Sequence, residues 1–193
     1  MNRSAAMSGF TLGLLMTGCA LAAAPTPAPA SYASDAARSQ LQFSGMQAGA
    51  EFKGVFKKFT VSAQFDPAQL MASRIEVQID VNSLDSQDDD RDKTMRSAEF
   101  FDVAKNPSAR YATRSISKSA NGYSAVGTLT LRGVSRDVPL ALQFTPAAGG
   151  ALLAGDATLK RLDFGVGQGE WTSTEWVGDE VKIHFSLSLK PAP

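Results

Sequence analysis

Alternation of apolar and polar residues, repeated along most of the chain, is the feature that most constrains its fold. In residues 74–81, apolar Ile75, Val77, Ile79 and Val81 alternate with polar or charged side chains. Successive side chains of a β-strand point to opposite faces, so this pattern predicts a strand with one buried and one solvated face. Comparable patterns give about eight strands in all, in residues 41–43, 52–65, 75–81, 111–118, 123–131, 138–144, 156–161 and 181–189.

Short connections separate these stretches. Asn121-Gly122 is a strong hairpin signal, and Asp66-Pro67 breaks a strand because proline has no N–H. Pro139 has the parity opposite to its apolar neighbours, which predicts a position near a strand end or on an edge. Antiparallel strands joined in this way are typical of an all-β barrel, whose interior either packs solid or holds one small ligand. A β-sandwich fits the same alternation.

The N-terminus has the features of an export signal. Arg3 precedes an apolar run that is too short to span a bilayer, which predicts a signal peptide over residues 1–22. Residues 15–19, Leu-Met-Thr-Gly-Cys, resemble a bacterial lipobox, in which cleavage before Cys19 leaves a lipidated cysteine. Met16 stands where a lipobox usually has leucine, and cleavage after Ala22 is the alternative. We therefore expect a periplasmic protein, either free or tethered to the outer membrane through Cys19.

Residues 23–36 are rich in proline and alanine, which predicts a solvated spacer before a single domain over residues 37–190. Nineteen basic and nineteen acidic residues balance, so no polycationic surface indicates a nucleic-acid partner. The single cysteine excludes an internal disulfide, and the single histidine, His184, has no second His or Cys in the predicted domain with which to bind zinc. No nucleophile-elbow motif is present. We expect neither an enzyme nor a metal site.

One stretch, residues 82–103, interrupts the alternation and could be a metal loop, a lid or a plug. Asp88, Asp90, Asp92 and Glu99 have the spacing of EF-hand calcium ligands. However, Lys93 occupies the position that an EF-hand reserves for glycine, and no amphipathic helix precedes the loop. The stretch therefore favours a lid or a plug over a calcium site.

The same stretch has the signals of a short helix. Ser86 and Asp89 have the spacing of a capping box, and aspartates in a first turn are favoured by the helix dipole. We therefore predict a helix near residues 88–98 that points Met95 inward. Phe100 and Phe101 follow it and are expected to pack across one mouth of the barrel.

Glycines occupy alternate positions, Gly165, Gly167 and Gly169, within residues 163–176. A phosphate-binding loop would need a following helix and a Lys-Ser/Thr pair, and neither is present. The pattern therefore predicts a bulged or sharply bent strand at a barrel corner. Trp171 and Trp176 flank the bend and could cap one end of a cavity.

Several separated motifs occur in a characteristic order. They are Phe-Asp-Pro (65–67), Val-Asn-Ser-Leu-Asp (81–85), Arg-Asp with Met-Arg-Ser and Glu-Phe-Phe-Asp-Val (91–103), Gly-Thr-Leu-Thr-Leu-Arg-Gly-Val (127–134) and Arg-Leu-Asp-Phe-Gly-Val-Gly (161–167). In this order they resemble the YceI-like family over residues 33–190. Ser86 stands where the family often has threonine, and Asn106-Pro107 replaces its aromatic-proline pair. The resemblance implies a periplasmic, lipocalin-like antiparallel barrel that binds polyisoprenoid lipids.

By that resemblance, inward-facing apolar residues are candidate contacts for a lipid tail. Those on the strands and the glycine-rich segment are Phe43, Phe59, Val61, Ile75, Val77, Ile79, Leu129, Leu131, Leu140, Leu142, Phe164, Ile183 and Phe185. Met95, Phe100, Phe101 and Trp171 complete the predicted lipid-binding set. Alternation alone allows the same residues to fill a solid core; the family resemblance favours a cavity.

Two functions are therefore compatible with the sequence. The first is an exported protein that holds an isoprenoid-type lipid, polyprenyl or quinone-like, for transport, storage or stress protection. The second is a non-enzymatic structural or stress-related protein with a filled core, dimeric through an outer strand face. The expected partner is the lipid itself, with a membrane tether through Cys19 and a homodimer as further options. No cofactor other than that lipid is expected.

Overall fold

The computed structural model describes residues 28–192, and these form one eleven-stranded antiparallel sheet with one α-helix. The strands are β1 (Ala30–Ser34), β2 (Gln40–Gln47), β3 (Ala50–Phe56), β4 (Phe59–Phe65), β5 (Arg74–Asp80), β6 (Leu84–Asp85), β7 (Ser108–Ser119), β8 (Gly122–Leu131), β9 (Val134–Ala147), β10 (Gly150–Lys160) and β11 (Glu180–Pro191). The helix is α1 (Asp89–Arg96), and the short 3₁₀ helices are η1 (Ala36–Arg38), η2 (Val81–Ser83), η3 (Arg161–Phe164) and η4 (Gly169–Thr172). The predicted signal peptide, Cys19 and residues 23–27 of the predicted spacer lie outside the described residues.

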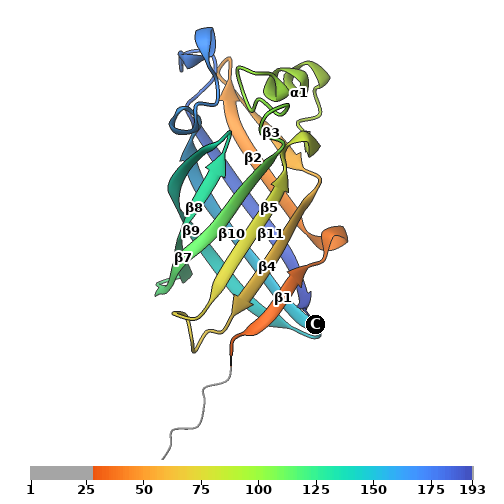
Figure 1. Ribbon diagram of the computed structural model, residues 1–193, viewed down its shortest axis with the longest axis vertical. Helices are drawn as coiled ribbons and strands as arrows, with labels where there is room; N and C mark the ends of the chain where they lie inside the picture. The colour runs from red at the N-terminus through yellow and green to blue at the C-terminus, as the bar shows by residue number, and fades with distance from the viewer. Residues whose placement is uncertain (1–27, 193) are drawn as a thin grey trace, which may run out of the picture.

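The sheet closes on itself, so the predicted all-β barrel is confirmed (Figure 1). Eight strands form the ring in the order β1-β4-β5-β7-β8-β9-β10-β11, and pairing of β1 with β11 closes it. Strand β11 also pairs with β2, so that Leu189 lies opposite Ser34 while Ile183 lies opposite Phe43. Strands β2, β3 and β6 thus extend one end of the barrel. Closure leaves few unpaired backbone groups, which stabilises an all-β chain against edge-to-edge association.

The expectation of a solvated spacer up to residue 36 is wrong for its last part. Ala30–Ser34 is strand β1, and it pairs with both β4 and β11. The chain bends between β1 and β2, where the Asp35 carboxylate accepts a hydrogen bond of 3.2 Å from the N–H of Ala37. The small residues Ala30, Ser31, Ala33 and Ser34 have little strand propensity. Tertiary pairing at the seam of the barrel therefore determines their conformation.

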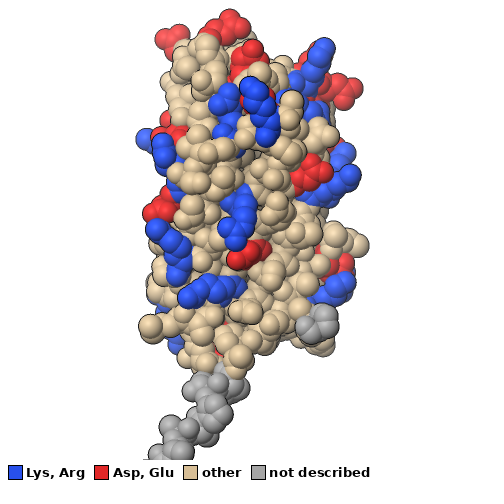
Figure 2. All heavy atoms as spheres, viewed as in Figure 1, with Lys and Arg blue, Asp and Glu red and all other residues tan. Residues whose placement is uncertain are grey.

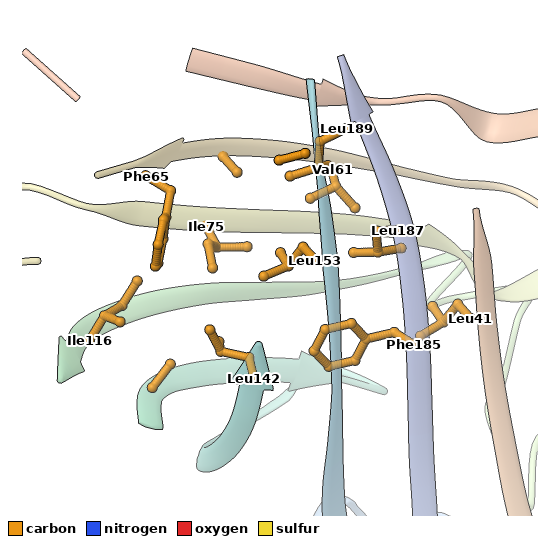
Figure 3. Close-up of a cluster of buried hydrophobic side chains, with 13 residues drawn as sticks. Leu41, Val61, Phe65, Ile75, Ile116, Leu142, Leu153, Phe185, Leu187 and Leu189 are labelled. Carbon is orange, nitrogen blue, oxygen red and sulfur yellow. The ribbon is translucent and has the colours of Figure 1, made fainter. Parts of the chain in front are cut away.

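A solid core closes the end of the barrel near the chain termini (Figure 3). Phe65 is buried there, with its ring 4.4 Å from the ring centroid of Phe144 and 5.1 Å from that of Tyr123. Ile116 and Leu189 are also buried in this cluster. Figure 3 shows the labelled side chains of this cluster, among them Phe65, Ile116 and Leu189, pointing from different strands into the barrel. This end is filled by side chains, as the barrel's small diameter allows.

At the other end the ring loosens between β9 and β10. Their ladder ends at the pair Ala141 and Asp156, so the first half of β9 pairs only with β8. Pro139 lies in that half, opposite Val126 of β8, and its missing N–H therefore costs no ladder hydrogen bond on the open side. The predicted edge position is thus correct, although Pro139 lies in the middle of a long strand.

The predicted bent strand over residues 163–176 is wrong. This segment is an irregular loop that contains η3 and η4, and it lies at the end of the barrel that also carries α1 (Figure 1). Gly165, Gly167 and Gly169 all have positive φ angles, of 66°, 93° and 62°. Their spacing of two therefore reflects a series of left-handed turns, which only glycine adopts at little cost.

Helix α1 confirms the predicted short helix, with a different cap. Asp88, and not Ser86, is the N-cap, because its carboxylate accepts a hydrogen bond of 3.0 Å from the N–H of Arg91. Ser86 is buried and donates its hydroxyl to Asp92 at 2.6 Å. The carboxylates of Asp90 and Asp92 thus belong to a helix and do not form a calcium-binding loop. Among residues 28–192, no helix is long and apolar enough to cross a membrane.

Candidate functional site

A cavity of about 420 Å³ occupies the half of the barrel that lies toward α1. Its wall consists of apolar side chains from the inward faces of the strands, because alternation along each strand sends every second residue into the barrel. The cavity ends where Leu142, Leu153 and Leu187 meet. Beyond them lies the solid core around Phe65. Tyr123 and Phe144, whose rings contact Phe65, do not border the cavity. The site is therefore an apolar pocket with a closed floor.

All the residues predicted to contact a lipid tail border this cavity, except Phe164. The strand residues on its wall are Phe43, Phe59, Val61, Ile75, Val77, Ile79, Leu129, Leu131, Leu140, Leu142, Ile183 and Phe185. Met95, Phe100, Phe101 and Trp171 border it from the segments that cover its open end. The expectation of an apolar space inside the barrel thus matches the structure.

Phe164 is the exception, and its prediction as a wall residue is wrong. It lies on η3, is 1% exposed and packs in a cluster with Phe100, Val138 and Val166. Phe164 has the parity opposite to the wall residues Ala157 and Leu159 of β10, and it lies in a 3₁₀ turn, where strand alternation no longer determines which side chains face the barrel. Phe164 fills the gap between β9 and β10 from behind the wall.

Further wall residues share the parity of predicted ones and could have been found by the same rule. Val181 and Leu187 have the parity of Ile183 on β11, and Leu41 has that of Phe43 on β2. The remaining apolar wall residues are Met46, Phe52, Phe56, Ala109, Tyr111, Val138, Leu153, Ala157, Leu159, Val166 and Val177, together with Gly45 and Gly178. The polar wall residues Gln47, Asp88, Asp90, Arg91, Thr94 and Arg161 carry no comparable signal in the sequence.

Two wall phenylalanines lie over glycines of the neighbouring strand. Phe43 is the cross-strand partner of Gly54, and a Cβ at Gly54 would overlap its ring. Phe185 is the partner of Gly155, where a Cβ would lie 2.7 Å from its Cζ. The absent side chains leave room for both rings at the wall. These pairs therefore set the width of the cavity.

Aromatic rings continue from Phe43 toward the open end. Phe43 lies 5.2 Å from Phe56 and 6.4 Å from Phe52, measured between ring centroids. Phe56 is in turn 6.5 Å from Phe101. Tyr111 adds a polar group to this part of the wall, a hydroxyl that donates a hydrogen bond of 3.2 Å to the carbonyl oxygen of Val138. Burial raises the pKa of Tyr111, so the hydroxyl stays neutral at ordinary pH.

The cavity reaches solvent at one mouth only within the described residues, because its exposed lining residues Met46, Asp88 and Asp90 all lie at this end. Helix α1 forms one side of the mouth. Arg91 holds it in place: Nε donates to the hydroxyl of Ser86 at 2.9 Å and Nη2 donates to the Ser86 carbonyl at 3.0 Å. The guanidinium also lies 4.8 Å above the ring of Phe52.

Residues 82–103, which we predicted to form a lid or a plug, turn apolar side chains toward the barrel and acidic ones toward solvent, as expected. Met95 and Phe100 are each 6% exposed and face the barrel, while Asp89 and Asp90 face solvent. Asp92 departs from that division, because it is buried and accepts hydrogen bonds from the N–H and hydroxyl of Ser86. This contact ties the helix to the segment that enters it.

The loop over residues 161–179 forms the other side of the mouth, and Arg161 organises it. Its side chain is buried and donates hydrogen bonds of 2.9–3.1 Å to the carbonyl oxygens of Val166, Ser173, Val177 and Gly178. Desolvation lowers the pKa of Arg161, and the charge of nearby Asp179 opposes that shift. Arginine stays charged in proteins, so one buried cation holds four main-chain carbonyls of this loop.

The two sides of the mouth are joined to each other. The carbonyl oxygen of Glu99 accepts hydrogen bonds from the N–H groups of Gly167 and Gln168, at 2.9 and 2.8 Å. Trp171 packs edge to face on Phe100, with 5.3 Å between ring centroids. Trp176, which we expected to cap the cavity with Trp171, does not border it and is 62% exposed.

The chain's one histidine does not border the cavity. His184 lies on the outer face of β11, where Nδ1 is 2.8 Å from the carboxylate of Asp156. Among residues 28–192, no group of three or more His, Cys, Asp or Glu side chains is placed to hold a metal ion. The arrangement can enclose an apolar ligand. Its charged lining side chains lie at the mouth, and the hydroxyl of Tyr111, deeper in the wall, is hydrogen-bonded to Val138.

Comparison with known proteins agrees with this geometry. The sequence profile of the YceI-like domain matches residues 32–189. A UPF0312 protein of Yersinia enterocolitica is 40% identical over 92 residues, which are 48% of each chain, and one of Enterobacter sp. is 42% identical over 45% of each, so the chain spans about half the length of these curated relatives.

Solved structures share the barrel. BcnA of Burkholderia cenocepacia is 31% identical, with a TM-score of 0.77 over 80% of this chain and 98% of that one. A polyisoprenoid-binding domain from Saccharophagus degradans, implicated in plant cell wall breakdown, is 21% identical, with a TM-score of 0.63 over 83% and 98%. At that identity the second likeness concerns the fold alone.

Proposed function

The chain belongs to the YceI-like family, and from that premise we propose that its barrel holds an isoprenoid-type lipid, polyprenyl or quinone-like. The observation that carries the proposal is the apolar cavity with a closed floor and one mouth. An isoprenoid tail is a flexible hydrocarbon with no polar groups, which suits an apolar wall whose charged side chains lie at one end. The head group would then remain near the mouth.

The energetics of burial support this ligand class. Each methylene removed from water contributes about 0.8 kcal/mol, so ten buried carbons give about 8 kcal/mol before the cost of ordering the tail. That gross value corresponds to roughly micromolar affinity. The aromatic wall around Phe43 and Phe56 can therefore retain a lipid without a strong polar contact.

The polyisoprenoid-binding domain from Saccharophagus degradans supports the same ligand class, because its barrel has the same fold. The cavity also weighs against the alternative of a structural protein with a filled core, since only the end around Phe65 is solid. We infer a binder or carrier and not a catalyst, for transport, storage or stress protection of the lipid.

We further propose that the protein works in the periplasm. This rests on the export features of residues 1–22, and attachment to the outer membrane through a lipidated Cys19 is the form that the lipobox-like sequence favours. Unchanged membrane fractionation of a Cys19→Ala variant would refute the tether and would leave the ligand proposal intact.

A displacement assay tests the ligand class. A dansyl-labelled farnesyl lipid is titrated with the protein, and unlabelled polyprenol, ubiquinone and a straight-chain fatty acid then compete. We expect saturable binding of one probe per chain and displacement by polyprenol or ubiquinone at lower concentrations than by the fatty acid. Probe fluorescence that rises without saturation, or displacement by none of the competitors, would overturn the proposal.

A further inference from the structure

The rim of the mouth carries two large apolar side chains that point into water. Met46, at the end of β2, is 44% exposed, and Trp176, in the loop over residues 161–179, is 62% exposed. Their segments run side by side: the N–H of Ala48 donates to the carbonyl of Trp176 at 2.8 Å, and the N–H of Gly178 donates to that of Met46 at 2.9 Å. Met46 and Gly178 also border the cavity. The apolar rim is therefore continuous with the cavity wall.

A tryptophan in this position has a characteristic use. Its ring combines a large apolar surface with one N–H donor, and tryptophan is enriched where proteins meet the boundary between lipid and water. The main chain of Trp176 is fixed by the bond from Ala48, and the loop around it is held by Arg161. The Trp176 side chain thus projects from a segment that hydrogen bonds hold in place, and it does not border the cavity.

Acidic groups surround this rim. Residues 168–180 contain Glu170, Glu175, Asp179 and Glu180 and no Lys or Arg. Asp88, Asp89 and Asp90 are exposed on the other side of the mouth, where α1 begins. Figure 2 shows Asp and Glu at the tip of this end of the molecule, the end that carries α1 in Figure 1, with Lys and Arg beside and below them. Such a rim repels anionic lipids and suits the cationic ammonium ends of zwitterionic head groups.

We propose that this end of the barrel docks on the surface of a zwitterionic bilayer, with Trp176 and Met46 inserted at the head-group level and the mouth facing the lipid. The inference rests on the proposed function, because a lipid too apolar to cross water must enter the cavity from a membrane. Docking in this orientation gives it a direct apolar path along Met46 into the barrel.

Sedimentation with vesicles of pure phosphatidylcholine tests the docking surface. All proteins carry Cys19→Ala, so that no lipid anchor contributes, and any contribution of residues 1–27 is common to every variant. We expect Trp176→Ser to weaken partition about tenfold and Trp176→Ser with Met46→Ser to weaken it further, as loss of interfacial apolar contact predicts. Partition of both variants equal to that of the parent would overturn the proposal.

Met71→Ser is the matched control. Met71 is 92% exposed in the loop between β4 and β5, at the opposite end of the barrel (Figure 1). We expect it to partition like the parent. A loss equal to that of Trp176→Ser would show unspecific adhesion through exposed apolar residues and would overturn the assignment of the rim.

Lipid composition provides a second test. Replacement of phosphatidylcholine by phosphatidylglycerol at low salt is expected to weaken partition, and added salt to restore it, because salt screens the repulsion from the acidic rim. Stronger partition on phosphatidylglycerol would contradict the assignment. Self-association that Trp176→Ser abolishes would likewise identify the rim as an interface between copies and overturn membrane docking.

Failure of docking can be told apart from failure of the cavity. Binding of the dansyl-farnesyl probe is measured for Trp176→Ser in the absence of vesicles. We expect binding like that of the parent, since Trp176 does not border the cavity. Intact probe binding together with unchanged vesicle partition would refute docking alone, whereas absent probe binding in the parent would refute the function on which it rests.

Discussion

Arg161 donates a hydrogen bond of 2.9 Å from Nη1 to the carbonyl oxygen of Val166, within a loop that would otherwise leave buried carbonyls without donors. Three further carbonyls accept from the same guanidinium. Gly167 makes this arrangement possible, because a Cβ at its position would overlap the guanidinium. One side chain thus holds the irregular half of the mouth in its folded shape.

Arg161→Met is expected to lower the free energy of unfolding by about 2–4 kcal/mol, because it removes the donors of one buried and three partly buried hydrogen bonds to main-chain carbonyls. Arg161→Lys should recover only part of this loss, since an ammonium cannot reproduce the planar fork of donors. Urea denaturation measures both. Arg136→Met is the control, because Arg136 is exposed and donates only to the neighbouring Ser135 carbonyl. Equal stabilities for the Arg161 and Arg136 variants would contradict the role of Arg161.

Asp92→Ala tests the attachment of α1. The substitution removes the acceptor of the Ser86 N–H and hydroxyl, both of which are buried, and should cost about 2 kcal/mol. Asp89→Ala, at an exposed position of the same first turn, should cost less than about 1 kcal/mol through the helix dipole. Thermal unfolding compares the two variants. A larger loss for Asp89→Ala would show that the Ser86 contact does not secure the helix.

Gly54→Ala is expected to destabilise the protein by about 1–3 kcal/mol, because the new methyl group overlaps the ring of Phe43. Phe43→Leu in the same chain should restore part of the loss by removing the far end of the ring. A double-mutant cycle of urea midpoints measures the coupling between the two sites. Additive effects would mean that the ring moves aside freely and that this pair does not set the cavity width.

Because the hydroxyl of Tyr111 is buried, we expect the protein to lose stability at alkaline pH. Burial raises its folded-state pKa above the unfolded value of about 10. The folded state therefore binds the Tyr111 proton more tightly than the unfolded state does. The resulting contribution to the free energy of unfolding is fully present below pH 10, and it is lost as the pH rises above that value. Tyr111→Phe should lose about 1 kcal/mol at neutral pH with the bond to Val138, and the difference from the parent should shrink above pH 10.

Urea unfolding of both proteins between pH 7 and 11 measures that difference. Tyr32 and Tyr123 are present in both proteins, so their contributions cancel in the comparison. A difference that stays constant with pH would contradict a buried, neutral Tyr111 in the folded state.

Much of the barrel and its wall could be predicted because both follow from a local rule. Parity along a strand determines which face a residue occupies, so Val77 and Ile183 could be assigned to the interior from neighbouring residues alone. The same holds for α1, whose aspartates signal a helix start within a few residues. These predictions needed no knowledge of which strands are paired.

Features that depend on distant segments could not be predicted in this way. Ala30–Ser34 forms a strand because β4 and β11 offer partners, and nothing in its small residues indicates that. Phe164 lies behind the wall because the chain leaves the strand at Arg161. Arg161 itself appears in the sequence as a basic residue before a glycine-rich segment, and its partners are carbonyls up to 17 residues away. Every residue has a main-chain carbonyl, so residue types do not indicate which carbonyls accept hydrogen bonds from Arg161.

Native mass spectrometry of the protein purified from its host, with analysis of an organic extract, tests the central claim most directly. Val77→Trp places an indole in the cavity, while Gln78→Trp places the same group on the outer face of the same strand. We predict a bound isoprenoid lipid in the parent and in Gln78→Trp, and its loss in Val77→Trp. An empty barrel in every preparation, or equal lipid occupancy in Val77→Trp, would contradict a lipid held in this cavity.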